Sequence, residues 1–86
     1  MMRADVQVAI LAAVREIQAS RRASRQVPDH ALVIGDGILD RMSEMYGRDV
    51  FYEALMTMVE DGTIEAGPTI RDTYLREVIT HKDLSI

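Results

Sequence analysis

The two histidines and the carboxylates near them are the residues that could perform acid–base or metal chemistry. Asp29 and Asp36 lie close to His30 in the sequence, and Asp83 lies close to His81. A zinc or catalytic role favours spacings such as H-x-x-H or H-E-x-x-H, and the sequence contains neither. It also contains no cysteine, which excludes thiolate ligation of zinc. We therefore expect a protein with no enzymatic activity, no metal and no cofactor.

Gly35-Asp36-Gly37 is a short glycine motif that is superficially similar to the start of a phosphate-binding loop. No third glycine or lysine follows at the spacing that such a loop requires. We interpret Asp36 as the N-cap of a helix, because its side chain can accept a backbone hydrogen bond at a helix start. The serines have no nucleophile-elbow context either.

Three clustered arginines, Arg21, Arg22 and Arg25, could contact phosphates, because the planar guanidinium suits bidentate contact with them. The alternative is that their charges complement the negative end of a helix dipole. Residues 1–25 carry a formal charge of +3, which leaves −7 on residues 26–86. A nucleic-acid contact would need a local basic patch that acts against this unfavourable overall charge.

Length and composition predict one folded domain over residues 1–86. The hydrophobic content is 48% and the charged content 28%, which is typical of a globular protein. Since no disulfide can stabilise so small a core, we expect packing and homodimerisation to do so. No apolar run approaches the ~20 residues of a membrane span. Arg3 and Asp5 stand where a signal peptide would have its hydrophobic region, so we expect a cytoplasmic protein without membrane contact.

The first half of the chain predicts two helices around a short strand. Apolar residues recur at helical spacing over roughly residues 4–23, and Pro28 then interrupts the pattern. Residues 30–34 are short, apolar and β-branched, so they predict a strand. A second helix follows over about residues 36–45. The expected buried residues of the two helices are Val6, Ile10, Ala13, Val14 and Ile17 in the first, and Ile38 or Leu39, Met42 and Met45 in the second.

The second half predicts a tight turn at residues 46–48, a third helix and a hairpin. The third helix starts near Asp49 and stops at Asp61-Gly62, where glycine suits the C-terminal cap. Residues 63–66 alternate polar and apolar and residues 73–80 are rich in β-forming residues, so both predict strands, with a loop at 67–72 and a flexible tail at 81–86. The third helix is expected to bury Phe51, Ala54, Leu55 and Met58. We predict that Phe51, Leu55 and Met58 pack against Ile10, Val14 and Ile17.

The succession of helix, short strand, helix, turn, helix and hairpin is similar to the winged-helix superfamily over residues 6–79. The strongest local match is the segment 54–65, ALMTMVEDGTIE. It resembles the end of the family's recognition helix, where an apolar residue, two polar residues and a glycine lead into the wing. The resemblance implies an α+β, winged-helix fold.

The resemblance also implies a docking surface. In DNA-binding relatives the third helix enters the major groove and the wing contacts the backbone or minor groove. The corresponding residues are Arg48, Asp49, Tyr52, Glu53, Met56 and Thr57 on the helix and Arg71 on the wing, to which Arg21, Arg22 and Arg25 would add phosphate contacts. The sequence departs from this pattern because Asp49 and Glu53 repel phosphates.

Two functions stay open at this point. The first is a DNA-binding or transcription-regulatory protein that binds duplex DNA weakly and in a salt-sensitive way. The second is a protein-interaction module that uses the acidic third helix and the Phe51, Tyr52 and Met56 neighbourhood. In either case we expect a homodimer that contacts its copy through the first helix, the segment after Ile79, or both.

Overall fold

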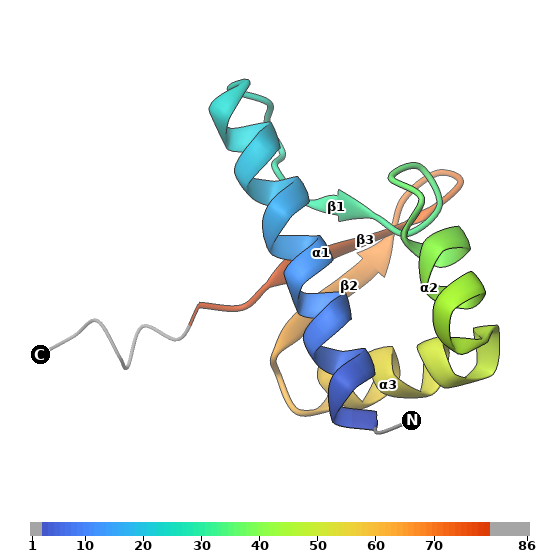
Figure 1. The fold of residues 1–86 in the computed structure, drawn as a ribbon. Coiled ribbons are helices and arrows are strands. Elements are labelled where there is room, and N and C mark those ends of the chain that lie inside the picture. The colour runs from blue at the N-terminus through green and yellow to red at the C-terminus, as the bar shows by residue number, and fades with distance from the viewer. Residues whose placement is uncertain (1–2, 80–86) are drawn as a thin grey trace, which may run out of the picture.

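The computed structural model describes residues 3–79 as three helices and one small antiparallel sheet (Figure 1). Both strand pairings are antiparallel, and the strand order is β1-β3-β2. The predicted α+β class is confirmed, and the elements follow one another in the predicted order. Their bounds are α1 Arg3–Ala23, β1 Ala31–Leu32, α2 Ile38–Tyr46, α3 Arg48–Glu60, β2 Ile64–Pro68 and β3 Thr73–Glu77. The predicted strand end at Thr80 and the predicted tail at 81–86 lie outside the described residues.

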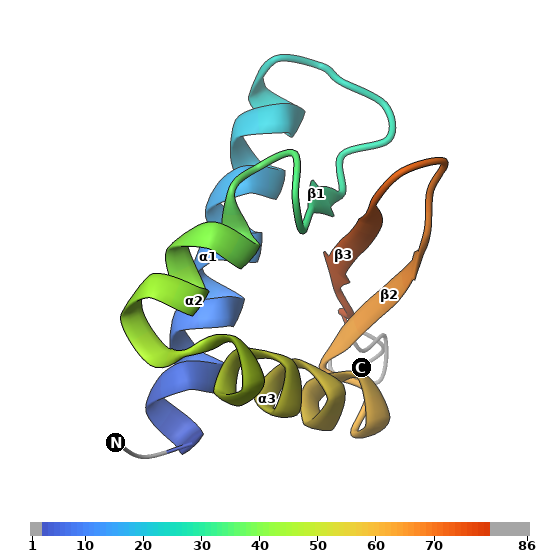
Figure 2. The ribbon, with the colours of Figure 1, turned by 90° about the vertical axis from the view of Figure 1, so that its right-hand side faces the viewer.

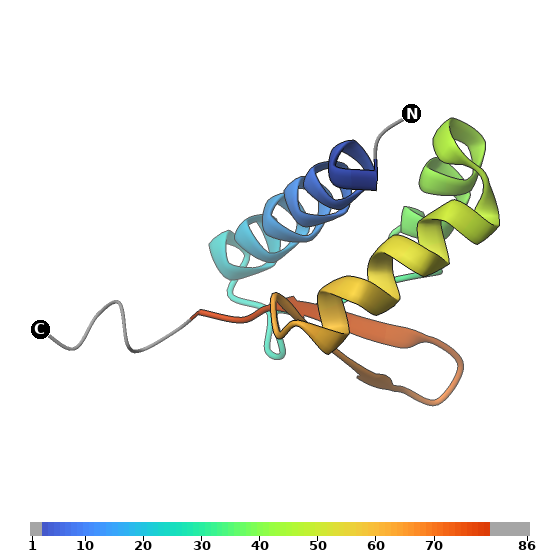
Figure 3. The same ribbon diagram turned by 90° about the horizontal axis from the view of Figure 1, so that it is seen from below.

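The helices lie on one face of the sheet. In Figure 3, α1 and the α2–α3 pair lie on the same side of the β2–β3 hairpin. In Figure 2, α3 crosses the N-terminal end of α1. This arrangement follows from amphipathicity, because each helix has one apolar stripe that must be covered.

The core forms where the stripes of α1 and α3 meet the inner face of the sheet. Ile10, Val14 and Phe51 are fully buried, and Leu55 and Met58 are at most 5% exposed. Ile17 packs against this cluster while partly buried. Five of the six residues are therefore buried in one cluster as predicted, whereas Ile17 is less buried than predicted. Ile64 of β2 and Leu75 of β3 complete the core from the sheet.

Two glycines make the reversals that join α2 to α3 and α3 to β2. Gly47 has φ 92° and Gly62 has φ 83°, a region that other residues rarely adopt. The Gly47 N–H donates to the Ser43 carbonyl at 2.8 Å, and the Thr63 N–H donates to the Met58 carbonyl at 2.9 Å. These bonds end both helices where the sequence predicts.

The prediction that Asp36 caps α2 is wrong. The helix begins at Ile38, and its N-cap is Gly37 at φ 74°, with no side-chain cap bond. The Asp36 carboxylate turns back instead and accepts the Leu32 backbone N–H at 2.6 Å. A charged partner on α1, described below, holds it there.

The prediction that Met45 is buried is also wrong, since its side chain is 58% exposed. The buried side of α2 runs through Ile38 and Met42, with Leu39 and Tyr46 packed beside them. Met45 therefore lies at the edge of the buried stripe, in the last turn.

The strands also differ in extent from the prediction. β1 has two residues, and β2 continues through Gly67 and Pro68. The Val78 and Thr69 N–H groups bond across the hairpin to Thr63 and Asp72. In the antiparallel register, residue 68 therefore directs its backbone nitrogen to the free edge, where a proline costs no ladder bond.

Candidate functional site

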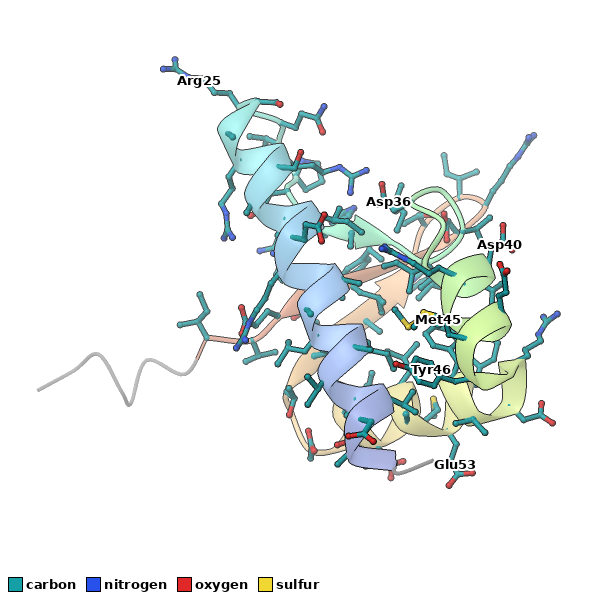
Figure 4. All side chains as sticks on the ribbon, in the orientation of Figure 1. Arg25, Asp36, Asp40, Met45, Tyr46 and Glu53 are labelled. Atoms are coloured by element: carbon teal, nitrogen blue, oxygen red, sulfur yellow. The ribbon has the colours of Figure 1, made fainter. Side chains whose placement is uncertain are left out.

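The solvent-facing side of α3 carries a row of acidic and apolar side chains that we call the α3 outer face. Asp49, Glu53, Met56 and Glu60 recur at spacings of four, three and four residues, so they share one side of the helix. All four are exposed, whereas the opposite side of α3 is buried in the core. In Figure 4 the Glu53 side chain projects outward at the bottom of the view.

Apolar and aromatic side chains border this face. Met56 within the face is 56% exposed, and Val50 and Tyr52 at its border are 39% and 37% exposed. The Tyr52 ring is tilted against Phe51 at a centroid distance of 5.1 Å, which anchors it on the core. The guanidinium carbon of Arg48 lies 5.8 Å from the centroid of the same ring, within cation–π range.

Thr57 differs from the other predicted residues of α3. It is half-buried, and its Oγ1 donates to the Glu53 carbonyl at 3.0 Å. The hydroxyl is thus engaged by the helix itself, a common arrangement for threonine within helices. It contributes less to the α3 outer face than the sequence predicts.

Arg21, a predicted phosphate contact, is engaged within the chain by Asp36. Its two terminal nitrogens donate to the two oxygens of Asp36, each at 2.7 Å. Nη1 also donates to the His30 carbonyl at 2.6 Å, and Nε donates to Gln26 at 3.2 Å. About four-fifths of both charged side chains is buried, at 21% and 17% exposure. This pair fastens the end of α1 to the loop between β1 and α2.

The other two arginines of the predicted patch do not join Arg21. Arg22 forms an ion pair with Asp29 at 3.5 Å, and Arg76 of β3 contacts the same carboxylate at 3.2 Å. Arg25 is exposed, has φ 59° and projects from the far end of α1 (Figure 4). The three arginines therefore do not form one phosphate-binding surface.

Arg71 lies in the loop of the hairpin, beside an Ile70 that is 98% exposed. The hairpin loop and α3 lie at opposite ends of the molecule (Figures 1 and 2). Arg71 is thus separated from the α3 outer face by the length of the hairpin.

Asp72 fixes the hairpin loop, a role that the sequence did not indicate. Its carboxylate accepts the backbone N–H groups of Ile34 at 2.9 Å, Gly35 at 2.8 Å and Thr73 at 2.7 Å. Desolvation raises the pKa of Asp72, but these three donors together outweigh it and leave the pKa below its ordinary value. The carboxylate therefore joins the hairpin loop to the loop that precedes α2.

Charge on the helix pair α2–α3 is mainly negative. Two arginines face five carboxylates within these helices, namely Arg41 and Arg48 against Asp40, Glu44, Asp49, Glu53 and Glu60. All five carboxylates and both arginines are exposed at the surface. Such a surface repels phosphate and attracts cations.

Neither a metal centre nor a membrane segment is found within residues 3–79. No group of three or more His, Cys, Asp or Glu side chains there could hold a metal ion. The His30 ring stacks on Tyr74 at a centroid distance of 4.8 Å, which gives it a packing role. His81 lies outside the described residues. None of the described helices combines the length and apolar content needed to cross a membrane.

Searches of family models, curated proteins and solved structures found no match to this chain. The function is therefore inferred from the surface of α3. The α3 outer face and its border contain five predicted residues, together with Val50 and Glu60, which were not predicted from the sequence. The five are Arg48, Asp49, Tyr52, Glu53 and Met56. Extending the helical period by one turn from Met56 would have indicated Glu60.

Proposed function

We propose that this chain is a winged-helix-like protein-interaction module that binds another protein through the α3 outer face and performs no chemistry. The arrangement of three helices, a β1-β3-β2 sheet and a hairpin after α3 supports the winged-helix-like assignment. The observation that carries the function is the combination of Met56 and Tyr52 with carboxylates on one exposed helix side. Methionine and aromatic residues are enriched at protein interfaces.

The charges favour a protein over a nucleic acid as the partner. DNA binding gains affinity when lysines and arginines neutralise phosphates, but the α3 outer face would bring three carboxylates against them. Arg21 and Arg22 are engaged by Asp36 and Asp29 and supply no compensating patch.

Affinity capture with matched variants tests the protein-interaction proposal. Met56→Asp places a charge in the centre of the α3 outer face, while Met45→Asp makes the same change on α2. The two methionines are equally exposed, at 56% and 58%, so both variants should fold alike. We expect quantitative mass spectrometry to find proteins that the wild type and Met45→Asp capture and Met56→Asp does not. Identical capture by both variants would contradict the proposal.

DNA binding is the second candidate, because exposed arginines also occur at the hairpin loop and at the end of α1. Arg71 and Arg25 are exposed and have no ion pair among the described residues. Each neutralised phosphate adds about 0.9 to the slope of log affinity against log salt. Arg25, Arg48 and Arg71 together would then give a slope of about three.

A salt titration of duplex binding decides this second candidate. The wild type is compared with Arg25→Ala, Arg48→Ala and Arg71→Ala, since substituting Arg21 would also break its ion pair with Asp36. We expect weak binding at low salt that is lost near physiological salt. Tight binding at physiological salt that depends on these arginines would establish DNA as the partner instead.

A further inference from the structure

We infer that a pocket between α1 and the sheet binds a small organic carboxylate through Arg22, Arg76 and Gln18. The pocket has a volume of about 430 Å³, within the size range of small-molecule sites. It lies between the C-terminal half of α1, the loop before β1, the start of β2 and the end of β3. No residue of α3 lines it, so the inference goes beyond the proposed function and does not depend on it.

Two guanidiniums at this pocket share one carboxylate, which holds both of them loosely. Arg22 Nη1 lies 3.5 Å from Asp29 Oδ2, and Arg76 Nη2 lies 3.2 Å from Asp29 Oδ1. Charge-assisted hydrogen bonds are shorter, at about 2.7–2.9 Å, and the two bonds of the Arg21–Asp36 pair have that length. Two positive charges therefore face one negative charge, and their N–H groups can still donate to a further acceptor.

Arg76 has a donor without an acceptor at this point. Its Nε is buried and has no hydrogen-bond partner within residues 3–79, although 44% of the side chain is exposed. Burying an N–H group without an acceptor is unfavourable. An anion in the pocket would supply the acceptor once the side chain turns toward it, and the planar guanidinium suits bidentate contact with a carboxylate. Arg76 therefore gains hydrogen bonds when the pocket is filled.

Gln18 adds a neutral donor in a fixed position. It is 4% exposed and lines the pocket, and its Oε1 accepts the Glu77 backbone N–H at 2.8 Å. This bond orients the amide and leaves Nε2 as the atom that can donate to a ligand. A polar side chain that is buried and anchored in this way is a preorganised part of a binding site.

The other carboxylates at the pocket limit the ligand to a single negative charge. Glu77 is paired with Arg15 at 2.6 Å. Glu65 accepts the Tyr74 hydroxyl at 3.2 Å and has no cationic partner within residues 3–79. Its charge offsets the surplus positive charge of the two arginines, so a dianion such as phosphate would gain little from this pocket.

One wall of the pocket is apolar. Val78 is 42% exposed and Ile79 is 60% exposed, and both line the pocket. A ligand with a short apolar group next to its carboxylate would remove these side chains from water. Two sources share this chemistry, namely a free aliphatic acid and the C-terminal carboxylate of a peptide that ends in an apolar residue.

NMR titration of the full 86-residue chain tests the inference with butanoate, butanamide and inorganic phosphate as probes. Butanamide has the shape of butanoate without its charge. A short peptide that ends in valine, with a free or an amidated C-terminus, distinguishes the two sources. The test variant is Arg22→Gln/Arg76→Gln. The control, Arg25→Gln/Arg71→Gln, removes two exposed arginines that do not line the pocket.

Thermal unfolding verifies that both variants fold. If the test variant does not, Arg22→Gln alone replaces it, because the Arg22 side chain is 55% exposed and its loss leaves Arg76 to pair with Asp29.

We expect butanoate or the free-acid peptide to bind saturably and to shift the Nε–Hε resonance of Arg76. The Kd should rise at least about tenfold with the test variant and change little with the control, and neither amide should bind. Tighter binding of the peptide than of butanoate would identify a peptide C-terminus as the ligand, and the reverse would identify a free acid. Three results would each overturn the inference: equal binding of acids and amides, tighter binding of phosphate, or a Kd that the test variant does not change. Absence of saturable binding at millimolar concentrations would overturn it as well.

Discussion

Asp36→Ala tests whether the Arg21–Asp36 pair is a principal stabilising contact outside the core. The substitution removes two guanidinium bonds of 2.7 Å and the 2.6 Å bond from the Leu32 N–H. It also leaves a largely buried guanidinium without its carboxylate, because Arg21 is only 21% exposed. Breaking a fully buried pair costs about 3–5 kcal/mol.

The expected loss for this variant is lower than that limit. Arg21 keeps its bonds to the His30 carbonyl and to Gln26, and about one-fifth of each side chain is accessible to water. We therefore expect a loss of about 2–4 kcal/mol in the free energy of unfolding. For a domain of this size, that corresponds to a decrease in Tm of roughly 10–25 °C.

Urea and thermal unfolding followed by circular dichroism measure this loss, with Arg15→Ala as the control. Arg15 pairs with Glu77 at 2.6 Å, but its side chain is 59% exposed, so we expect little loss there. A double-mutant cycle with Arg21→Met then isolates the coupling between Arg21 and Asp36. A loss for Asp36→Ala no larger than that for Arg15→Ala would show that burial does not strengthen the Arg21–Asp36 pair.

Four further outcomes are expected. Leu55→Ala should cost about 2–5 kcal/mol in chemical denaturation, because Leu55 is 5% exposed and its removal leaves a cavity; a loss near zero would mean that α3 packs through another side. Asp72→Asn should lower the free energy of unfolding near neutral pH, because the folded state lowers the pKa of the wild-type carboxylate. Falling pH protonates that carboxylate, so the difference in stability between the two proteins should shrink below the unfolded-state pKa of 3.8. A difference that does not change with pH would contradict the role of Asp72. Gly67→Ala should lower Tm modestly, because a Cβ there would lie 2.5 Å from the Tyr74 ring and displace it. Light scattering should find a homodimer that Val8→Asp disrupts, since Val8 is 69% exposed on α1; a wild-type monomer at high concentration would reject this.

The helices, the turns and much of the core could be predicted because their determinants are local. The helical period of α1 and α3 places Ile10, Val14 and Phe51 on buried stripes whatever the rest of the chain does. Gly47 and Gly62 mark reversals because their backbone conformations are unfavourable for other residues.

The charged contacts could not be predicted because their partners are distant in the sequence. Asp72 binds Ile34 and Gly35 across 38 and 37 positions, and Arg21 binds Asp36 across 15. Local pattern assigns Asp36 to a helix cap, where it would accept one backbone bond. The tertiary structure offers it a bidentate guanidinium and a backbone donor, which together are stronger.

These pairings decide which charges can bind a partner. Within residues 3–79, Arg15, Arg21, Arg22 and Arg76 are paired with carboxylates of the same chain. Other exposed arginines are scattered over the end of α1, α2, the start of α3 and the hairpin loop. The carboxylates of Asp49, Glu53 and Glu60 share one side of α3 with Met56. Since charges further apart than about 8 Å are largely screened at physiological salt, a scattered set attracts a polyanion weakly. The positive net charge of residues 1–25 is therefore a poor guide to the binding surface.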